Sequence, residues 1–159
     1  MRSATVTELK RELKTKEHEE LVNLTLRLAK FKKENKELLT YLLFEEHDEH
    51  HFVDGVKEEI DEMFSSINSS TFYFIKKSVR KILRHTKKHI RYSKKKETEA
   101  ALLIHFCLRL SEMEPSFQRS TPLINLFARQ ITLIQKAIST LHEDLQYDLN
   151  LELEQLLDD

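Results

Sequence analysis

Glycine and proline are almost absent from the 159-residue sequence, which has one glycine, Gly55, and two prolines, Pro115 and Pro122. Strand-rich folds need many residues that tolerate positive φ in their turns, and phosphate-binding loops need several glycines close together. One glycine therefore excludes the dinucleotide-binding fingerprint, the P-loop and the Gly-x-Ser-x-Gly turn of serine hydrolases. The scarcity also favours an all-α protein.

Cysteine and long apolar runs are scarce as well. Cys107, the only cysteine, cannot form an intramolecular disulfide, and its place in the apolar run 100–110 predicts a buried thiol. No stretch approaches 18 consecutive apolar residues, so we expect no membrane span. Residues 1–5 are not followed by an apolar stretch, so we expect no signal peptide and a cytoplasmic location.

Apolar residues recur three and four apart along most of the chain, as they do on amphipathic helices. Thr5 and Glu8 have capping-box spacing, Thr15 is a second candidate N-cap, and Ser70 or Thr71 is a third. The stripes comprise Leu21, Leu24, Leu28 and Phe31; Leu38, Leu39, Leu42 and Leu43; Phe52, Val56, Ile60, Met63 and Ile67; Ile75, Val79, Ile82, Thr86 and Ile90; and Leu149, Leu153 and Leu156.

Two further segments predict how these helices pack. Residues 100–110 are apolar on nearly every side, which places this helix centrally, with only His105, Arg109 and Glu112 on an outer strip. Thr121-Pro122 predicts an N-cap followed by the first helical residue. The stripe that follows is Ile124, Phe127, Ile131, Ile134, Ile138, Leu141 and Leu145, and it predicts a core-facing helix or a dimerising coiled-coil seam.

We therefore predict an all-α fold, a single domain over residues 1–159 with about seven antiparallel helices. Both an irregular bundle and a short stack of helical hairpins fit this pattern. We expect a mobile N-terminus at residues 1–6 and an acidic C-terminal end at residues 149–159.

Positive charge is concentrated in residues 76–96, which hold 11 Lys or Arg and no acid, while the other 15 basic residues stand against all 27 acids. Eight of them fall on the side opposite the apolar stripe: Lys76, Lys77, Arg80, Lys81, Arg84, Lys87, Lys88 and Arg91. This face, about 24 Å long at about 1.5 Å per residue, is typical of polyanion-binding helices. It has no interleaved aromatic residues, so we expect contact with a nucleic-acid backbone without sequence readout.

One alternative is that an acidic protein partner binds this face, and another is that acids elsewhere in the chain or in a second copy balance its charge. Residues 45–62 carry nine acids and one lysine, and residues 143–159 carry seven acids and no base. Because Asp54, Glu58 and Asp61 point away from their own apolar stripe, only flanking charges should meet across that hairpin. The acidic C-terminus, from the same chain or from a second copy, is the better candidate to cover the basic helix.

Histidines form two pairs with metal-ligand spacing. His47 and His51 are four residues apart, as are His85 and His89, so each pair lies on one helix face. The two pairs do not face a common interior, which leaves a polar surface as the alternative to a metal-binding bundle. Neither the HEXXH motif nor a pair of Glu-x-x-His motifs is present.

No catalytic constellation is evident. Cys107 and His105 are two apart, so on a helix they point to different sides. We therefore expect no enzymatic activity, no cofactor and no small-molecule substrate. The favoured hypothesis is a helical interaction or scaffold domain that binds a protein partner or itself. Nucleic-acid or polyanion binding through residues 76–96 is the first alternative, and a metal-binding helical bundle is the second.

Overall fold

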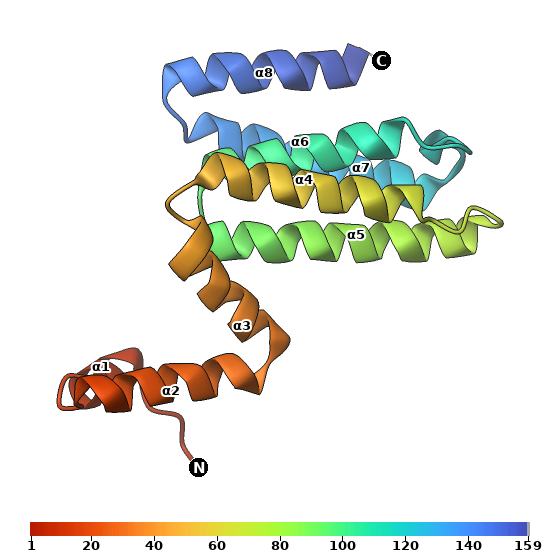
Figure 1. Cartoon of the computed structure of the whole chain (residues 1–159). Coiled ribbons are helices and arrows are strands. Elements are labelled where there is room, and N and C mark those ends of the chain that lie inside the picture. The colour runs from red at the N-terminus through yellow and green to blue at the C-terminus, as the bar shows by residue number, and fades with distance from the viewer. Residues whose placement is uncertain (159) are drawn as a thin grey trace. The chain divides into compact units, whose positions relative to one another are not determined.

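The computed structural model describes residues 1–158, and over that range it consists of eight α-helices with no strand (Figure 1). The helices are α1 (Val6–Leu13), α2 (His18–Phe31), α3 (Lys33–Thr40), α4 (Glu49–Ser65), α5 (Phe72–Ser93), α6 (Lys96–Ser111), α7 (Thr121–Ser139) and α8 (Glu143–Asp158). A π-helical turn, η1 (Tyr41–Glu45), and a 3₁₀ turn, η2 (Phe117–Arg119), join them. The prediction of an all-α fold is confirmed.

The chain divides into two compact units, Met1–Phe44 and Glu45–Asp159. The single domain over residues 1–159 stays a prediction. Over residues 1–158, no helix is both long and apolar enough to cross a membrane.

The first unit contains α1, α2 and α3. The predicted capping box is present, since Thr5 N donates to Glu8 Oε2 (2.7 Å) and Glu8 N donates to the Thr5 hydroxyl (3.2 Å). Thr15 was a wrong prediction, because its hydroxyl donates to the carbonyl of Glu12 at the end of α1. Glu17 precedes α2 instead, and its N–H donates to the carboxylate of Glu20. The predicted mobility of residues 1–6 stays a prediction.

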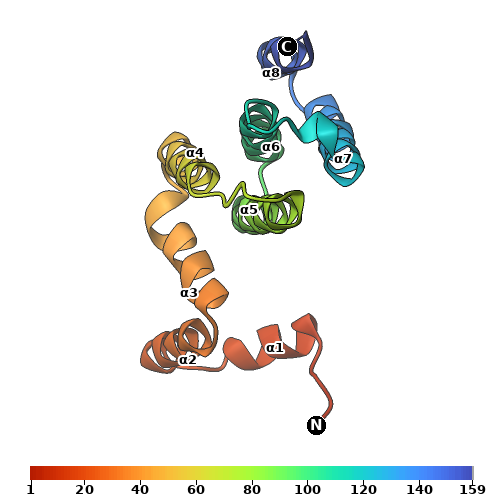
Figure 2. The same cartoon turned by 90° about the vertical axis from the view of Figure 1, so that its right-hand side faces the viewer.

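The second unit is a bundle of α4 to α8 in which consecutive helices run in opposite directions (Figure 1). Helix α6 lies at its centre and packs against α4, α5, α7 and α8 (Figure 2). Apolar residues all around α6 cause this arrangement, because each side must be covered. Its buried apolar residues are Ala100, Leu102, Leu103, Ile104, Phe106, Cys107 and Leu110, so the prediction of a central helix is confirmed.

Helix α7 differs from its prediction in where it begins and in which of its residues are buried. Ser120 is the N-cap residue, so Thr121 is the first helical residue and Pro122 lies in the first turn. The helix ends at Ser139, before two residues of the predicted stripe, Leu141 and Leu145. Its buried residues are Leu123, Leu126, Gln130, Ile134, Ala137 and Ile138. The predicted stripe therefore lay one row away from most of the buried face, and Ile124 is exposed.

Candidate polyanion-binding face and histidine sites

Helix α5 begins after Thr71, whose hydroxyl accepts the N–H of Phe74. Its apolar side, Ile75, Val79 and Ile82, is buried in the packing against α4 and α6. Because these side chains fix the rotation of the helix, the opposite side faces solvent. Lys77, Arg80, Lys81, Arg84 and Arg91 are exposed there, and Lys76, Lys87 and Lys88 are half-buried. We call these eight side chains the basic face.

Most of the basic face has no acidic partner. Among residues 45–158 of the second unit, no carboxylate lies within 4.0 Å of the charged nitrogens of seven members: Lys76, Lys77, Arg80, Lys81, Arg84, Lys87 and Arg91. Lys88 differs, since it takes part in an interaction. By contrast, Lys95 and Lys96, just beyond the helix, pair with Glu49 at 3.2 Å and Glu99 at 2.9 Å.

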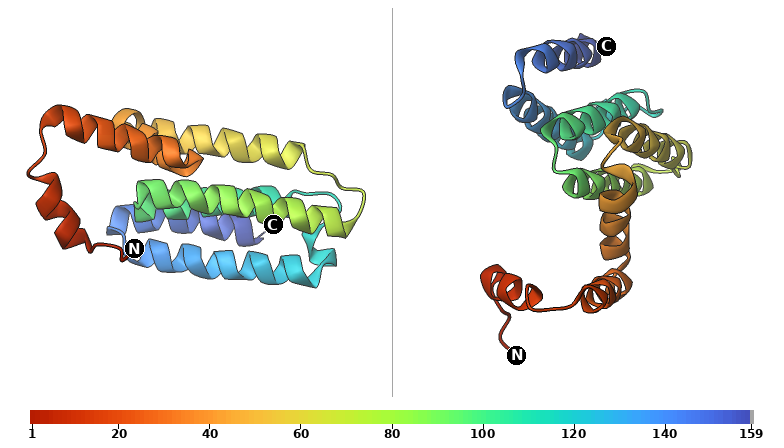
Figure 3. Two further views of the ribbon diagram at one scale, coloured as in Figure 1. Left: turned by 90° about the horizontal axis from the view of Figure 1, so that it is seen from below. Right: turned by 60° about the vertical axis from the view of Figure 1, so that its left-hand side comes forward.

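The acidic C-terminal helix does not cover the basic face of its own chain. Leu149, Leu153 and Leu156 are buried where α8 packs on α6 and α7, on the far side of the second unit from α5 (Figures 1 and 3). The acids of α8 are exposed: Glu143, Asp144, Asp148, Glu152, Glu154 and Asp158. Cover from within the chain was a wrong prediction over the described residues, and Asp159 lies outside them. Cover by a second copy stays a prediction.

Two other acids of α4, Glu59 and Asp61, pair with histidines and one arginine. Glu59 Oε2 lies 2.7 Å from His85 Nε2 on α5. Asp61 Oδ1 accepts hydrogen bonds from His105 Nε2 and Arg109 Nε, both at 2.6 Å. Asp61 was predicted to point away from the apolar stripe of α4, and its partners on α6 were not predicted, because only the pairing of α4 with α5 was considered.

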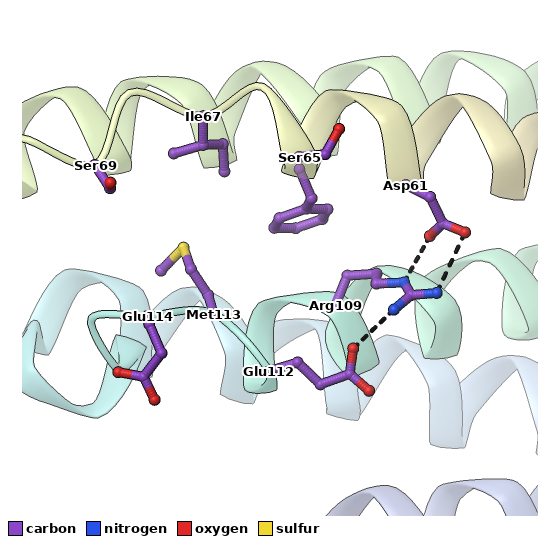
Figure 4. Close-up of a pocket in the computed structure, with 9 residues that line it drawn as sticks. Asp61, Ser65, Ile67, Ser69, Arg109, Glu112, Met113 and Glu114 are labelled. Carbon is purple, nitrogen blue, oxygen red and sulfur yellow. Dashed lines mark hydrogen bonds and ion pairs between the residues drawn. The ribbon is translucent and has the colours of Figure 1, made fainter.

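Arg109 also borders a surface pocket of about 480 Å³ (Figure 4). Its guanidinium lies between Asp61 and Glu112, with Nη1 donating to Glu112 at 2.8 Å. Burial raises the pKa of Asp61, but the hydrogen bonds from Arg109 and His105 outweigh it, so this pKa lies below its ordinary value. Two carboxylates neutralise the only cation that lines the pocket, which therefore has no charge left to bind an anion.

The two histidine pairs have different surroundings. His51 Nδ1 lies 3.0 Å from Glu45 Oε2, and this hydrogen bond raises the pKa of the exposed His51. Over residues 1–158, neither His47 nor His51 belongs to a group of three side chains close enough to share a metal ion.

His85 and His89 do belong to such a group, together with Glu59. Each residue offers a ligand atom, and these atoms lie within 4.8 Å of one another. The sequence predicted His85 and His89 as candidate metal ligands, but not Glu59. Spacing along one helix identifies pairs on that helix, and it does not show which residue of a neighbouring helix completes them.

Cys107 is not positioned to act as a nucleophile. Its side chain is buried in α6, and this burial raises the pKa of the thiol to about 12. The thiolate is therefore disfavoured at neutral pH.

No protein-family model, curated protein or solved structure matches the chain.

Proposed function

We propose that the protein binds the phosphate backbone of a nucleic acid through the basic face of α5. The observation that carries this proposal is the row of seven cations without an acidic partner among the described residues of the second unit. Cations along one helix face neutralise successive phosphates and release their counterions, which makes binding favourable and strongly dependent on salt.

The charges elsewhere in the chain support an external partner. Helix α8, which carries the C-terminal acids, packs on α6 and α7, on the far side of the second unit from α5 (Figure 1). Residues 1–44 hold ten Lys or Arg and seven Glu, so the first unit has a net positive charge. Helix α8 therefore supplies no acidic cover for α5, and the net charge of the first unit does not favour it as one.

The composition of the face favours phosphates over an acidic protein. Protein interfaces have an apolar or aromatic centre from which charged residues are depleted. The exposed large apolar residues of α5, Tyr73 and Phe74, lie in its first turn, before the basic face begins. Because no aromatic side chain lies among the cations, we expect little preference for base sequence.

The test is the affinity for a labelled RNA duplex, measured by fluorescence anisotropy at several salt concentrations. Arg80→Glu together with Arg84→Glu changes two exposed cations of the face. We expect affinity to fall at least tenfold at about 0.1 M salt, and the slope of log K against log salt to become shallower by about two.

The control is Arg129→Glu together with Lys136→Glu, which changes the net charge equally on the exposed side of α7. We expect this variant to bind almost as the wild type does. Equal weakening in both variants would show that overall charge, and not the basic face, governs binding. Absence of binding by the wild type at low salt would overturn the proposal.

A second proposal concerns protein interaction, and a different observation supports it. In the first unit only Ala29 and Tyr41 are buried apolar residues. Helices α2 and α3 and the turn η1 leave nine large apolar side chains exposed: Val22, Leu24, Leu26, Leu28, Phe31, Leu38, Leu42, Leu43 and Phe44. A groove of about 260 Å³ between the two helices is lined by Leu28, Leu38 and Leu42, among others.

We propose that a second copy of the chain covers this groove. Units of this size seldom bury enough surface to be stable alone. A two-fold dimer would place the same apolar side chains of both copies against each other. Sedimentation equilibrium tests this: Leu28→Glu with Leu38→Glu should give a monomer, whereas the control Tyr147→Glu with Leu151→Glu, on the exposed side of α8, should stay dimeric. A monomeric wild type at high concentration would contradict this proposal.

A further inference from the structure

Glu59 of α4 and His85 and His89 of α5 bring three metal-binding side chains together across the helix pair. We propose that these residues form a binding site for a divalent transition-metal ion, with zinc as the best match. Two imidazoles and one carboxylate are ligands that zinc takes in proteins, and three protein ligands leave one position of its tetrahedron open.

The hydrogen bonds of His89 prepare it as a ligand. Its Nδ1 donates to the carbonyl of His85, at 2.8 Å, which leaves the lone pair on Nε2. That Nε2 lies 3.9 Å from Glu59 Oε2. A backbone carbonyl that holds the other ring nitrogen is the usual support of a metal-bound histidine, because it fixes both the tautomer and the ring orientation.

A hydrogen bond joins His85 to Glu59, and its proton lies where the ion would bind. His85 Nε2 and Glu59 Oε2 are 2.7 Å apart, so both ligand atoms point to the same place. An ion bound there replaces that proton, and the His85 ring and the Glu59 side chain need only small rotations to admit it. About half of the Glu59 side chain is exposed, so the ion enters from solvent without unfolding of the bundle.

The surroundings of His89 keep it rigid and favour its neutral form. The rings of Phe52 and Tyr92 lie beside it, with centroids 6.1 and 5.4 Å away. Burial lowers the pKa of His89, and neighbouring positive charge from His85 and Lys88 acts in the same direction, against backbone and Glu59 interactions that raise it. A neutral imidazole is the form that binds metal. Lys88 repels an ion as well, so we expect moderate affinity.

A second histidine pair in the chain serves as a control for the proposed site. His47 and His51 have the same spacing as His85 and His89 but are exposed and lack a third ligand at the required distance. If spacing alone were sufficient, both pairs would bind. The proposal requires the pair on α5 to bind far more tightly, because α4 supplies Glu59.

The experiment is zinc titration of the metal-free full-length chain by calorimetry, with the visible spectrum of added Co²⁺ as a report on ligand type. We expect one ion per chain in the wild type and in His47→Gln with His51→Gln. Because loss of supporting residues alone costs tenfold to about a hundredfold in affinity, we expect His85→Gln, His89→Gln and Glu59→Gln each to lose at least tenfold.

Thermal unfolding gives a second measurement. An ion that joins α4 to α5 should raise the midpoint in the wild type, and it should raise it much less in Glu59→Gln, a conservative change at an exposed residue that leaves the fold intact. Unchanged zinc affinity in Glu59→Gln and His89→Gln, or no uptake by the wild type, would overturn the proposal. Neither result bears on RNA binding, whose test uses other residues.

Discussion

Asp61 joins α4 to α6 through charge. Its carboxylate accepts hydrogen bonds from His105 and from two nitrogens of Arg109, at 2.6, 2.6 and 3.3 Å. We expect Asp61→Asn to lower the free energy of unfolding by about 1 kcal/mol, a value reduced for the partial exposure of the pair. Urea denaturation at neutral pH measures the change.

The effect of Asp61→Asn should depend on pH in a defined direction. Because the pKa of Asp61 is lowered in the folded protein, its contribution is present above the unfolded value of about 3.9 and is lost as pH falls through the folded value. The difference between wild type and variant should therefore shrink in acid. Glu58→Gln, an exposed change on the same helix, is the control and should change stability little at any pH.

Gln130 is a polar residue on the buried side of α7. Its Nε2 donates to the carbonyl of Leu126 at 3.0 Å, but its Oε1 is buried without a hydrogen-bond partner among the described residues. An unsatisfied buried oxygen is unfavourable, and a methionine fills a similar volume without it. We expect Gln130→Met to raise the free energy of unfolding by about 1 kcal/mol in urea denaturation. A large loss instead would mean that the amide has a role that the geometry does not show.

At the scale of helices, strong apolar periodicity predicted the buried faces well, whereas the N-cap residues were predicted less well. The buried residues of α4 and α8, and four of the six of α5, were predicted because one apolar stripe dominates each helix, whereas Tyr92 and Ser93 of α5 were missed. On α7 two adjacent rows are both apolar, so Ile124 and Leu123 competed for the core, and packing against α6 decided the phase. Gln130 contributed to the wrong assignment of the buried side, because a polar residue interrupts the row of apolar residues there.

Both α5 and α7 have a threonine near their start, but only one of the two caps its helix. Thr71 caps α5 with its hydroxyl, whereas Thr121 is the first residue inside α7 and Ser120 stands before it. We expect Thr71→Ala to lower the free energy of unfolding by about 1 kcal/mol and Thr121→Ala to have almost no effect. Thermal or urea unfolding distinguishes them. Equal losses would place the α7 cap at Thr121, as the sequence alone suggested.

At the scale of the whole molecule, composition predicted the charge concentrations but not their places. Residues 76–96 and 143–159 have opposite charges, and Coulomb attraction alone would bring them together. The burial of the apolar side chains of α6 outweighs this attraction, because α5 and α8 must cover different sides of α6. Burial of apolar residues therefore places the two charged segments apart. The sequence pattern does not show which side of α6 each of them covers. For the same reason Glu59 joined His85 and His89 only in three dimensions.

The two units should differ in local stability. Helix α6 contains eight buried residues, whereas α1 contains none and α2 only Ala29. Short helices without tertiary packing are marginal in water, so their amides open easily. In hydrogen exchange at low protein concentration, we expect amides of α1, α2 and α3 to exchange at least about a hundredfold faster than those of α6. Raising the concentration should slow α2 and α3 and leave α1 and α6 unchanged, because only α2 and α3 form the proposed contact with a second copy. Strong protection of α2 and α3 at the lowest concentration would instead mean that these helices are covered within a single chain.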